Sequence, residues 1–218
     1  MEIIAAESEI VTDLYAEVQQ RFAGVDDLAH GWEHVKRVYT LAVHIAEREG
    51  ANRFITAMAA LMHDLGRLSH ETTGHHADLS ARFAAELLKP YHLAQDTQEA
   101  ILHAITAHSY SRGIEPYTLE AGVLRDADRL DSLGAIGILR WAITGTIRRT
   151  SQTQTYHPAD PFAEQHIPDD KKYMLDHFFT KLLKLPDDMI THTGRIMAQQ
   201  RVAFMRTYLD ELRRELDS

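Results

Sequence analysis

AALMHDLGRL, residues 59–68, places a histidine and an aspartate side by side at the end of an apolar segment. The apolar side chains around this pair recur at helical spacing, with Phe54, Met58, Leu61 and Leu65 on one stripe. His63 and Asp64 are about 100° apart around a helix, so both can reach one ion only near a helix end. We predict that Gly66 supplies this end, because glycine is common just beyond the last helical turn.

A second histidine faces inward in the preceding segment, HGWEHVKRVYTLA, residues 30–42. His34 shares its helix face with apolar residues that follow at spacings of four, three and four, which are Val38, Leu41 and Ile45. The spacing therefore predicts a helix over 32–45 with His34 among core side chains. A polar group in such a place needs a partner, because burying it alone is costly.

A third segment, LRDADRLDSLGAIGILR, residues 124–140, adds a carboxylate. Its spacing predicts a helix over 119–133, one side of which is lined by Leu124, Ala127, Asp128 and Asp131. Asp126 falls on another side with Gly122 and Arg129. We therefore choose Asp128, not Asp126, as the fourth ligand of the ion.

His34, His63, Asp64 and Asp128 are together the expected ligands of a catalytic divalent metal ion. Neutral imidazole and carboxylate are ligand types that hold such ions, and two of each leave coordination positions open for water and substrate. The alternative is a buried hydrogen-bond network of the same side chains without an ion. The ordered pattern of the four residues favours the metal site.

These three segments resemble the His…His-Asp…Asp signature of the HD-domain superfamily of metal-dependent phosphohydrolases. HFFTKLLKL (177–185) and MITHTGRIMAQQRVAFMRTYL (189–209) are similar to the C-terminal part of a small stand-alone bacterial branch, some of whose members act as nucleotide pyrophosphohydrolases. The resemblance covers about residues 25 to 212. It implies an all-α helical bundle with one bound divalent ion, which could be Mn, Ni, Co, Fe, Zn or Mg because His/Asp sites accept many metals.

The implied activity is metal-dependent phosphohydrolysis, in which the ion polarises a phosphoryl oxygen and lowers the pKa of bound water to about 7. Its most specific form is hydrolysis of nucleoside triphosphates, either dNTP or NTP, to monophosphate and pyrophosphate. A 5'-nucleotidase or a cyclic-nucleotide phosphodiesterase is the enzymatic alternative. An alternative of another class is a non-catalytic metal-dependent nucleotide sensor that uses a long loop as its switch.

A phosphate substrate also needs cations besides the metal. Arg37 lies one turn after the first histidine ligand, Arg140 interrupts an apolar helix, and Lys181 lies in the family-like C-terminal segment. We expect these three residues to bind substrate phosphates. Arg37 could instead pair with Glu33 on a solvated face. Arg140 could be the buried partner of Asp128 or Asp131, and the lysine could simply lie on the surface.

We expect Asp64, Asp131 and His108 to take part in catalysis. Asp131 stands one turn after Asp128 and could orient a ligand or accept a proton from the attacking water. His108 could donate to a phosphate, act as a general acid or be a core histidine. His76 is expected to line the substrate pocket or to join the metal shell, and with His108 it could hold a second ion. We prefer a single ion, as in the branch that the chain resembles.

The composition limits the other function classes. The chain has 218 residues, a formal charge of -9 and no cysteine. The negative charge argues against broad binding of nucleic acid, whereas local positive charge could still hold a small anion. The absence of cysteine excludes disulfides and thiolate zinc sites. The N-terminal MEIIAAESEI has neither a basic region nor a long apolar run, so we expect a cytoplasmic protein without a membrane span, either monomer or homodimer.

We expect one all-α domain over residues 1–218, with its core at about 25–145. Further helical stripes cover 10–22, 79–88 and 101–108. The segment 135–147 is apolar nearly all round, which predicts a buried central helix. A polar segment with three prolines predicts a long loop at about 150–168, of the kind that forms lids or is disordered. C-terminal helices are expected at about 169–216.

Overall fold

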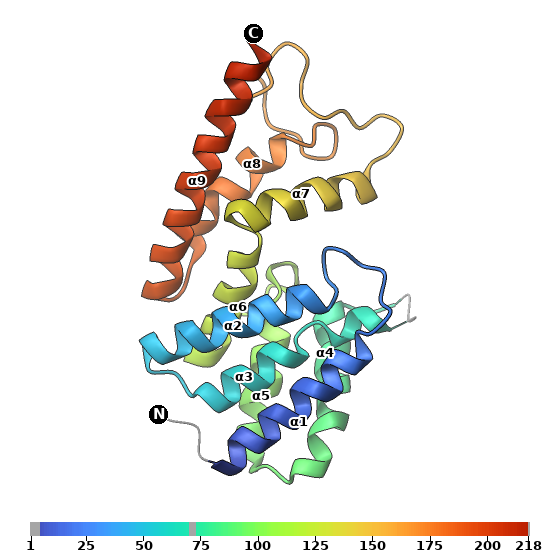
Figure 1. Cartoon of the computed structure of the whole chain (residues 1–218), viewed down its shortest axis with the longest axis vertical. Coiled ribbons are helices and arrows are strands. Elements are labelled where there is room, and N and C mark those ends of the chain that lie inside the picture. Colours follow the sequence, from blue (N-terminus) through green and yellow to red (C-terminus); the bar gives the residue numbers. More distant parts are fainter. Residues whose placement is uncertain (1–4, 70–72, 218) are drawn as a thin grey trace. The chain divides into compact units, whose positions relative to one another are not determined.

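Helices make up all the regular secondary structure of the residues that the computed structural model describes, which are 5–69 and 73–217 (Figure 1). One isolated β-bridge, between Gln154 and Tyr173, is the only β-pairing in these residues. The all-α fold class is therefore confirmed.

The chain separates into two compact units, and the boundary falls inside a helix. The first unit is Met1–Asp128 with Ile190–Gly194, and the second is Arg129–Met189 with Arg195–Ser218. One domain over 1–218, with a core at about 25–145, stays a prediction.

The first unit contains six α-helices in its described residues, the last of which continues into the second unit. They are α1 (Ala5–Arg21), α2 (Trp32–Glu49), α3 (Arg53–Met62), α4 (His76–Leu88), α5 (Gln95–Ala107) and α6 (Leu119–Asp131). Three short 3-10 helices join them: η1 (Leu65–Leu68), η2 (Lys89–Tyr91) and η3 (Tyr110–Arg112). The α-helices cover the segments where the sequence predicts helical stripes.

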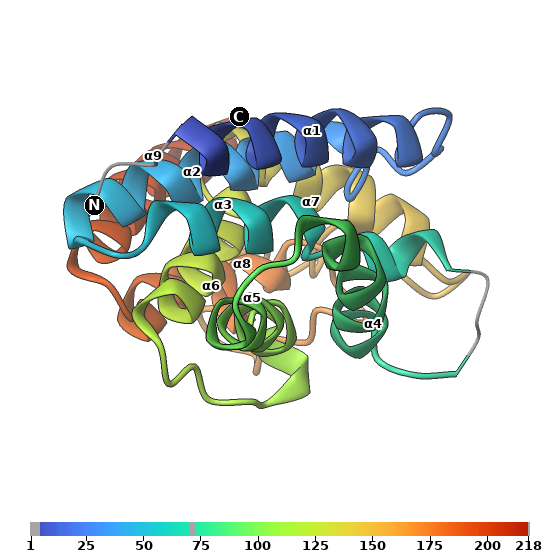
Figure 2. The same ribbon diagram turned by 90° about the horizontal axis from the view of Figure 1, so that it is seen from below.

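Helix α3 is the centre of the first unit, because it packs against α1, α2, α4 and α5. Figure 2 shows it between α1 and α5. Small side chains allow this close packing, since Ala57, Ala59 and Ala60 are completely buried. Asn52 is the N-cap of α3, and its side chain accepts hydrogen bonds from two backbone N–H groups of the first turn.

Helix α3 ends at Met62, so the predicted helix end beside the histidine-aspartate pair is confirmed. We predicted that Gly66 supplies this helix end, but its backbone is not in the left-handed region that a glycine beyond the last turn would adopt. Its structural role is therefore a different one. A Cβ atom at Gly66 would lie 2.2 Å from the carbonyl oxygen of His76. The backbone N–H of Gly66 donates to Ser80 Oγ at 2.8 Å. Gly66 therefore lets η1 lie directly against the first turn of α4.

The second unit contains α7 (Gly134–Arg148), α8 (Asp176–Thr180), η4 (Leu182–Asp188) and most of α9 (His192–Leu216). Aromatic side chains join its three α-helices. Phe178 of α8 meets Trp141 of α7 edge to face with ring centroids 5.0 Å apart, and it stacks on Tyr208 of α9 at 6.1 Å. These contacts form the apolar centre of the unit.

Helix α7 is not the buried central helix that we predicted. Only Gly134, Gly137 and Arg140 of this helix are buried, whereas Leu139 and Ile147 are 59% and 67% exposed. The prediction was wrong because an apolar composition does not say which face of a helix packs. The packed face of α7 consists of its two buried glycines and its buried arginine. No helix among the described residues has the length and apolar composition needed to cross a membrane.

Residues 149–175, which include the predicted loop, contain no helix, and a histidine holds part of this segment in place. His166 Nδ1 lies 2.8 Å from Asp160 Oδ2, and His166 Nε2 lies 2.8 Å from Asp176 Oδ2. A neutral imidazole has a single N–H, so hydrogen bonds to two ionised carboxylates require the imidazolium form. The bonds to Asp176 and Asp160 raise the pKa of His166.

We predict that His166→Gln removes a pH-dependent part of the stability. The pKa of His166 is raised above 6.5 in the folded state, so its contribution is complete below 6.5 and is lost as the pH rises through the raised pKa. Backbone and side-chain hydrogen bonds from His166 lower the pKa of Asp160 from 3.8, so the contribution is also lost as the pH falls through that lowered pKa.

The measurement is the thermal midpoint against pH for the wild type, for His166→Gln and for His44→Gln as an exposed-histidine control. The wild type should exceed His166→Gln most between about pH 4 and pH 6.5, and the difference should shrink at higher pH. An unchanged difference across this range would contradict the imidazolium assignment.

Candidate metal centre

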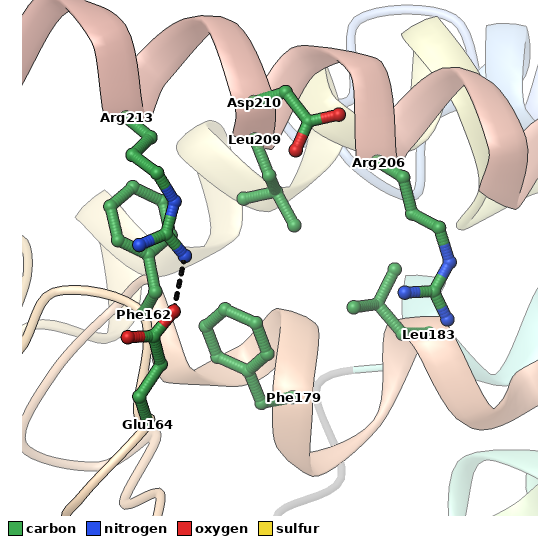
Figure 3. Close-up of a pocket in the computed structure, with 8 residues that line it drawn as sticks. All are labelled: Phe162, Glu164, Phe179, Leu183, Arg206, Leu209, Asp210 and Arg213. Carbon is green, nitrogen blue, oxygen red and sulfur yellow. Dashed lines mark hydrogen bonds and ion pairs between the residues drawn. The ribbon is translucent and has the colours of Figure 1, made fainter.

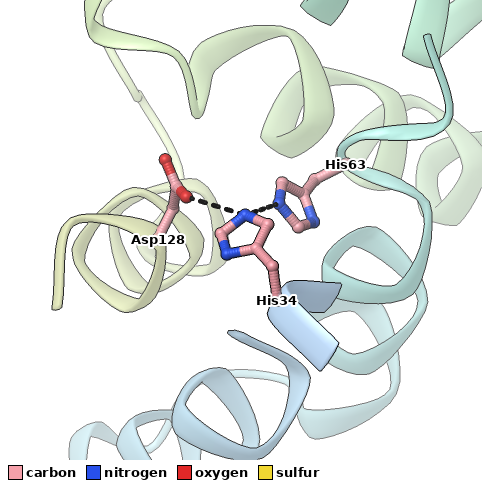
Figure 4. Close-up of side chains that lie close together, drawn as sticks. All are labelled: His34, His63 and Asp128. Atoms are coloured by element: carbon pink, nitrogen blue, oxygen red, sulfur yellow. Dashed lines mark hydrogen bonds and ion pairs between the residues drawn. The ribbon is translucent and has the colours of Figure 1, made fainter. Parts of the chain in front are cut away.

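The first unit brings His34, His63, Asp64 and Asp128 together from α2, the end of α3 and α6. Figure 4 shows His34 between His63 and Asp128. His34 Nε2 lies 3.3 Å from His63 Nε2, 3.4 Å from Asp128 Oδ1 and 3.5 Å from Asp64 Oδ2. The two histidines and Asp64 are buried, whereas the Asp128 side chain is 30% exposed.

This spacing fits a bound divalent ion. Ligand bonds of about 2.1 Å place neighbouring donor atoms about 3.0 to 3.4 Å apart in octahedral or tetrahedral geometry. The observed separations around His34 Nε2 are close to that range. Asp64 Oδ1 is also buried and has no hydrogen-bond donor among the described residues, which is costly for a carboxylate oxygen unless a cation satisfies it.

The rings of His63 and His108 are oriented so that their Nε2 atoms face the centre. His63 Nδ1 lies 2.8 Å from the carbonyl oxygen of Ala60, and His108 Nδ1 lies 2.5 Å from that of Ile105. A carbonyl accepts only from N–H, so both Nδ1 atoms carry a proton, and Nε2 is the atom that has a lone pair for an ion when the ring is neutral. Such backbone contacts are common in histidine metal ligands, where they fix the tautomer.

Electrostatics keep these ligands in their metal-binding protonation states. Burial lowers the pKa of His63 to about 4, so its imidazole is neutral at neutral pH. Burial alone would raise the pKa of Asp64, but His63, His34 and Arg67 outweigh it and hold that pKa well below its usual value. The pKa of Asp128 is likewise lowered, because the hydrogen bond and charge of His34, followed by the charge of His63, outweigh its partial desolvation.

A second group of donors lies on the other side of the Asp64 carboxylate. Asp64 Oδ1 is 3.8 Å from His76 Nε2 and 3.9 Å from His108 Nε2. Burial, followed by the charge of Arg67, lowers the pKa of His76 to about 3, so this ring is neutral too. The three residues form a group that could hold a second ion, and the expectation that His76 lines the substrate pocket stays a prediction.

Arg67 is a residue of the site that we did not predict. Its Nε donates to Asp64 Oδ2 at 2.6 Å, and its side chain is 32% exposed. The signal was present in the sequence, because Arg67 follows Asp64 by three residues in HDLGR. It orients the carboxylate and places a cation at the edge of the centre.

Other predicted site residues are placed as follows. Arg37 is half-buried on α2, one turn after His34, and its substrate contact stays a prediction.

Arg140 donates through Nη1 to Asp131 Oδ2 at 2.8 Å, and both side chains are buried in the second unit. This pairing is the alternative that we considered for Arg140. Lys181 is exposed in the second unit, between α8 and η4. The substrate roles of Arg140 and Lys181 and the catalytic role of Asp131 stay predictions.

The two aspartates of the DAD sequence have different surroundings. Asp126 is completely buried and accepts hydrogen bonds from Ile190 N at 3.0 Å and from Thr191 N and Oγ1 at 2.7 Å. A Cβ atom at Gly194 would lie 2.6 Å from Asp126 Oδ2, so the chain passes close to this carboxylate. Asp126 therefore anchors Ile190–Gly194 within the first unit, and Asp128 is the carboxylate that faces the histidines.

Comparisons with known proteins agree with this geometry. The family model of the HD domain matches residues 31–133, which include all four proposed ligands. The chain is similar to YpgQ of Bacillus subtilis, with 34% identity over 193 residues that cover 86% of this chain and 84% of YpgQ. The crystal structure of B. subtilis YpgQ in complex with ADP superposes with a TM-score of 0.75 at 31% identity and covers 96% of both chains. An HD-superfamily hydrolase from Bacillus thuringiensis superposes with a TM-score of 0.76 at 29% identity, over 97% of this chain and 99% of that one.

We predict that His63→Ala and Asp64→Ala each lose the bound metal, because each removes one of the four proposed ligands. Loss of one ligand should weaken metal binding at least about tenfold. Elemental analysis of protein purified without chelators measures the metal content per chain, and His44→Ala is the matched control on the exposed face of α2. Full metal content in both variants would refute the ligand assignment.

We further predict that stability and metal binding separate at the DAD sequence. Asp126→Asn should lower the free energy of unfolding by about 2 kcal/mol, because it places an amide against backbone donors, and it should keep the metal. Asp128→Ala should lose the metal and change the stability of the metal-free protein by about 1 kcal/mol or less. Urea unfolding in EDTA and elemental analysis measure the two effects. Loss of the metal in Asp126→Asn together with full metal content in Asp128→Ala would instead make Asp126 the ligand.

Proposed function

Because this chain belongs to the HD-domain superfamily of metal-dependent phosphohydrolases, we propose that it hydrolyses nucleoside triphosphates to nucleoside monophosphate and pyrophosphate. The observation that carries the nucleotide part is the ADP complex of YpgQ, a protein that aligns with 96% of this chain. ADP carries the base, the sugar and the phosphoanhydride that such a substrate would present. HD domains bind a divalent metal, and the His/Asp cluster offers the donors for it.

The bound ion, held by His34, His63, Asp64 and Asp128, would polarise a phosphoryl oxygen and lower the pKa of water. In the proposed reaction the water oxygen bonds to the α-phosphorus, the bond from that phosphorus to the bridging oxygen breaks, and pyrophosphate leaves. The protein must then accept the proton of the water and stabilise the charge on the phosphates.

Two residues near Asp64 suit these tasks. His108 directs its Nδ1 proton at the carbonyl oxygen of Ile105, which leaves Nε2 as the ring nitrogen that faces the centre and can exchange a proton there. This orientation supports a general acid or a general base, and the general-acid role stays a prediction. Arg67 is bonded to Asp64 and is one-third exposed, which leaves part of its guanidinium able to reach a phosphate oxygen.

We predict that the purified protein with Mn²⁺ releases pyrophosphate from at least one member of a dNTP and NTP panel. Product analysis identifies the reaction, because a 5'-nucleotidase releases phosphate from monophosphates and a cyclic-nucleotide phosphodiesterase opens a cyclic ring. His108→Gln should lower kcat by about 100-fold or more while keeping the metal. Binding without turnover of any member would instead indicate a nucleotide sensor, and absence of both would refute the nucleotide proposal.

A further inference from the structure

The second unit contains a pocket of about 460 Å³, which falls within the size range of small-molecule sites. It lies between the C-terminal half of α7 and two stretches of the long irregular segment. Its lining residues are Trp141, Thr144, Gly145, Arg148, Arg149, Thr150, Thr153, Asp170, Lys171, Met174 and His177. All of them belong to the second unit.

The irregular segment is ordered by backbone pairing where it forms the pocket. Gln154 N donates to the carbonyl oxygen of Lys172 at 2.8 Å, and Met174 N donates to that of Gln154 at 2.9 Å. This pairing aligns residues 150–154 with residues 171–174. As a result, Lys171 lines the same pocket as Arg148 at the last turn of α7.

The pocket carries an excess of positive charge, with three cations against one carboxylate. That carboxylate, Asp170, is already engaged by His177 Nδ1 at 2.7 Å and by Thr180 Oγ1 at 3.2 Å. Burial lowers the pKa of His177, so its ring is neutral at neutral pH. In the described part of the chain, no carboxylate forms an ion pair with Arg148 or Lys171. Such a concentration of unbalanced cations is unexpected in a chain with a charge of -9.

One wall of the pocket is a fixed aromatic ring. The indole N–H of Trp141 donates to the carbonyl oxygen of Met174 at 2.8 Å, and the ring packs edge to face on Phe178. An aromatic wall beside cations suits a ligand that carries both a flat group and several negative charges.

Another pocket of the second unit, of about 320 Å³, lacks this excess charge. Figure 3 shows that Arg213 is paired with Glu164, and that Asp210 and Arg206 both lie on α9. Its two cations are matched by two carboxylates. Charge therefore distinguishes the pocket of Arg148 and Lys171 as the one that suits an anion.

We propose that the pocket lined by Arg148, Arg149 and Lys171 binds a polyphosphate anion, either free pyrophosphate or the phosphate groups of a nucleotide. The three cations bind the phosphate oxygens, and Trp141 provides the surface against which a base would stack. This binding needs no metal ion and no hydrolysis.

Intrinsic fluorescence tests the proposal, because Trp141 lines the pocket and the chain has only one other tryptophan. Trp32→Phe makes Trp141 the single reporter. Titrations in EDTA with sodium pyrophosphate, ADP and adenosine should give a saturable change with the first two and none with adenosine. Equal affinities would identify the free anion as a sufficient ligand, and about tenfold tighter binding of ADP would identify a nucleotide.

Neighbouring lysines provide the matched control. In the same background, Arg148→Ala combined with Lys171→Ala should raise the Kd for pyrophosphate about tenfold or more, whereas Lys172→Ala should change it less than about twofold. Lys172→Ala removes one positive charge next to Lys171, from a side chain that lies over the ring of Tyr173 at 5.0 Å and outside the pocket lining.

Three results would overturn the proposal: no saturable change with either anion, adenosine binding as tightly as ADP, or an equal effect of Lys172→Ala and the double variant. Because EDTA prevents turnover, these results leave the nucleotide hydrolysis proposal untouched, and failure of hydrolysis leaves this one untouched.

Discussion

The ionised carboxylate of Asp64 is the constraint on which the first unit depends. The residue is 1% exposed, a position in which a carboxylate alone would be very costly. Its Oδ2 faces His34 and Arg67, and its Oδ1 faces His76 and His108 but accepts no hydrogen bond from the described residues. A divalent ion bound by Asp64 would satisfy this oxygen, so we expect metal binding to stabilise the fold as well.

The surrounding structure serves to hold this carboxylate in position. Helix α3 ends at Met62, immediately before the His63-Asp64 pair, and its own position is fixed by close packing on four neighbouring helices. Gly66 then lets η1 approach α4 closely, which brings His76 to the second oxygen of Asp64. Rigid elements thus place donors from distant parts of the sequence within a ligand's reach of one another, as a site with fixed geometry requires.

The sequence could predict the elements and the inward-facing polar residues because both depend on local periodicity. Helical spacing places His34 on a packed face and separates Asp128 from Asp126 around the helix. It does not show that Asp126 is completely buried against Ile190 and Thr191, whereas Asp128 is 30% exposed. Contacts between elements leave no such signal. Position 66 needs a glycine because the backbone of α4 lies against it. The exposed side of α7 depends on which of its faces packs against a neighbour. The bonds that hold His166 between Asp160 and Asp176 likewise join residues whose spacing follows no regular pattern.

Charge balance explains why cations outside the metal centre matter for a phosphate ligand. If Asp64 and Asp128 hold a divalent ion, their charges cancel it and neutral histidine ligands add none, so the positive charge left at the loaded centre is that of Arg67. The ion and its ligands would stabilise a phosphoryl group in direct contact but would attract a polyphosphate from solution only weakly. The rest of the chain has an excess of acidic residues and opposes such an approach. Local cations such as Arg67 would therefore have to supply affinity for a polyphosphate at the metal centre, whereas the cations of the pocket of Arg148 and Lys171 belong to the second unit and would bind an anion there independently.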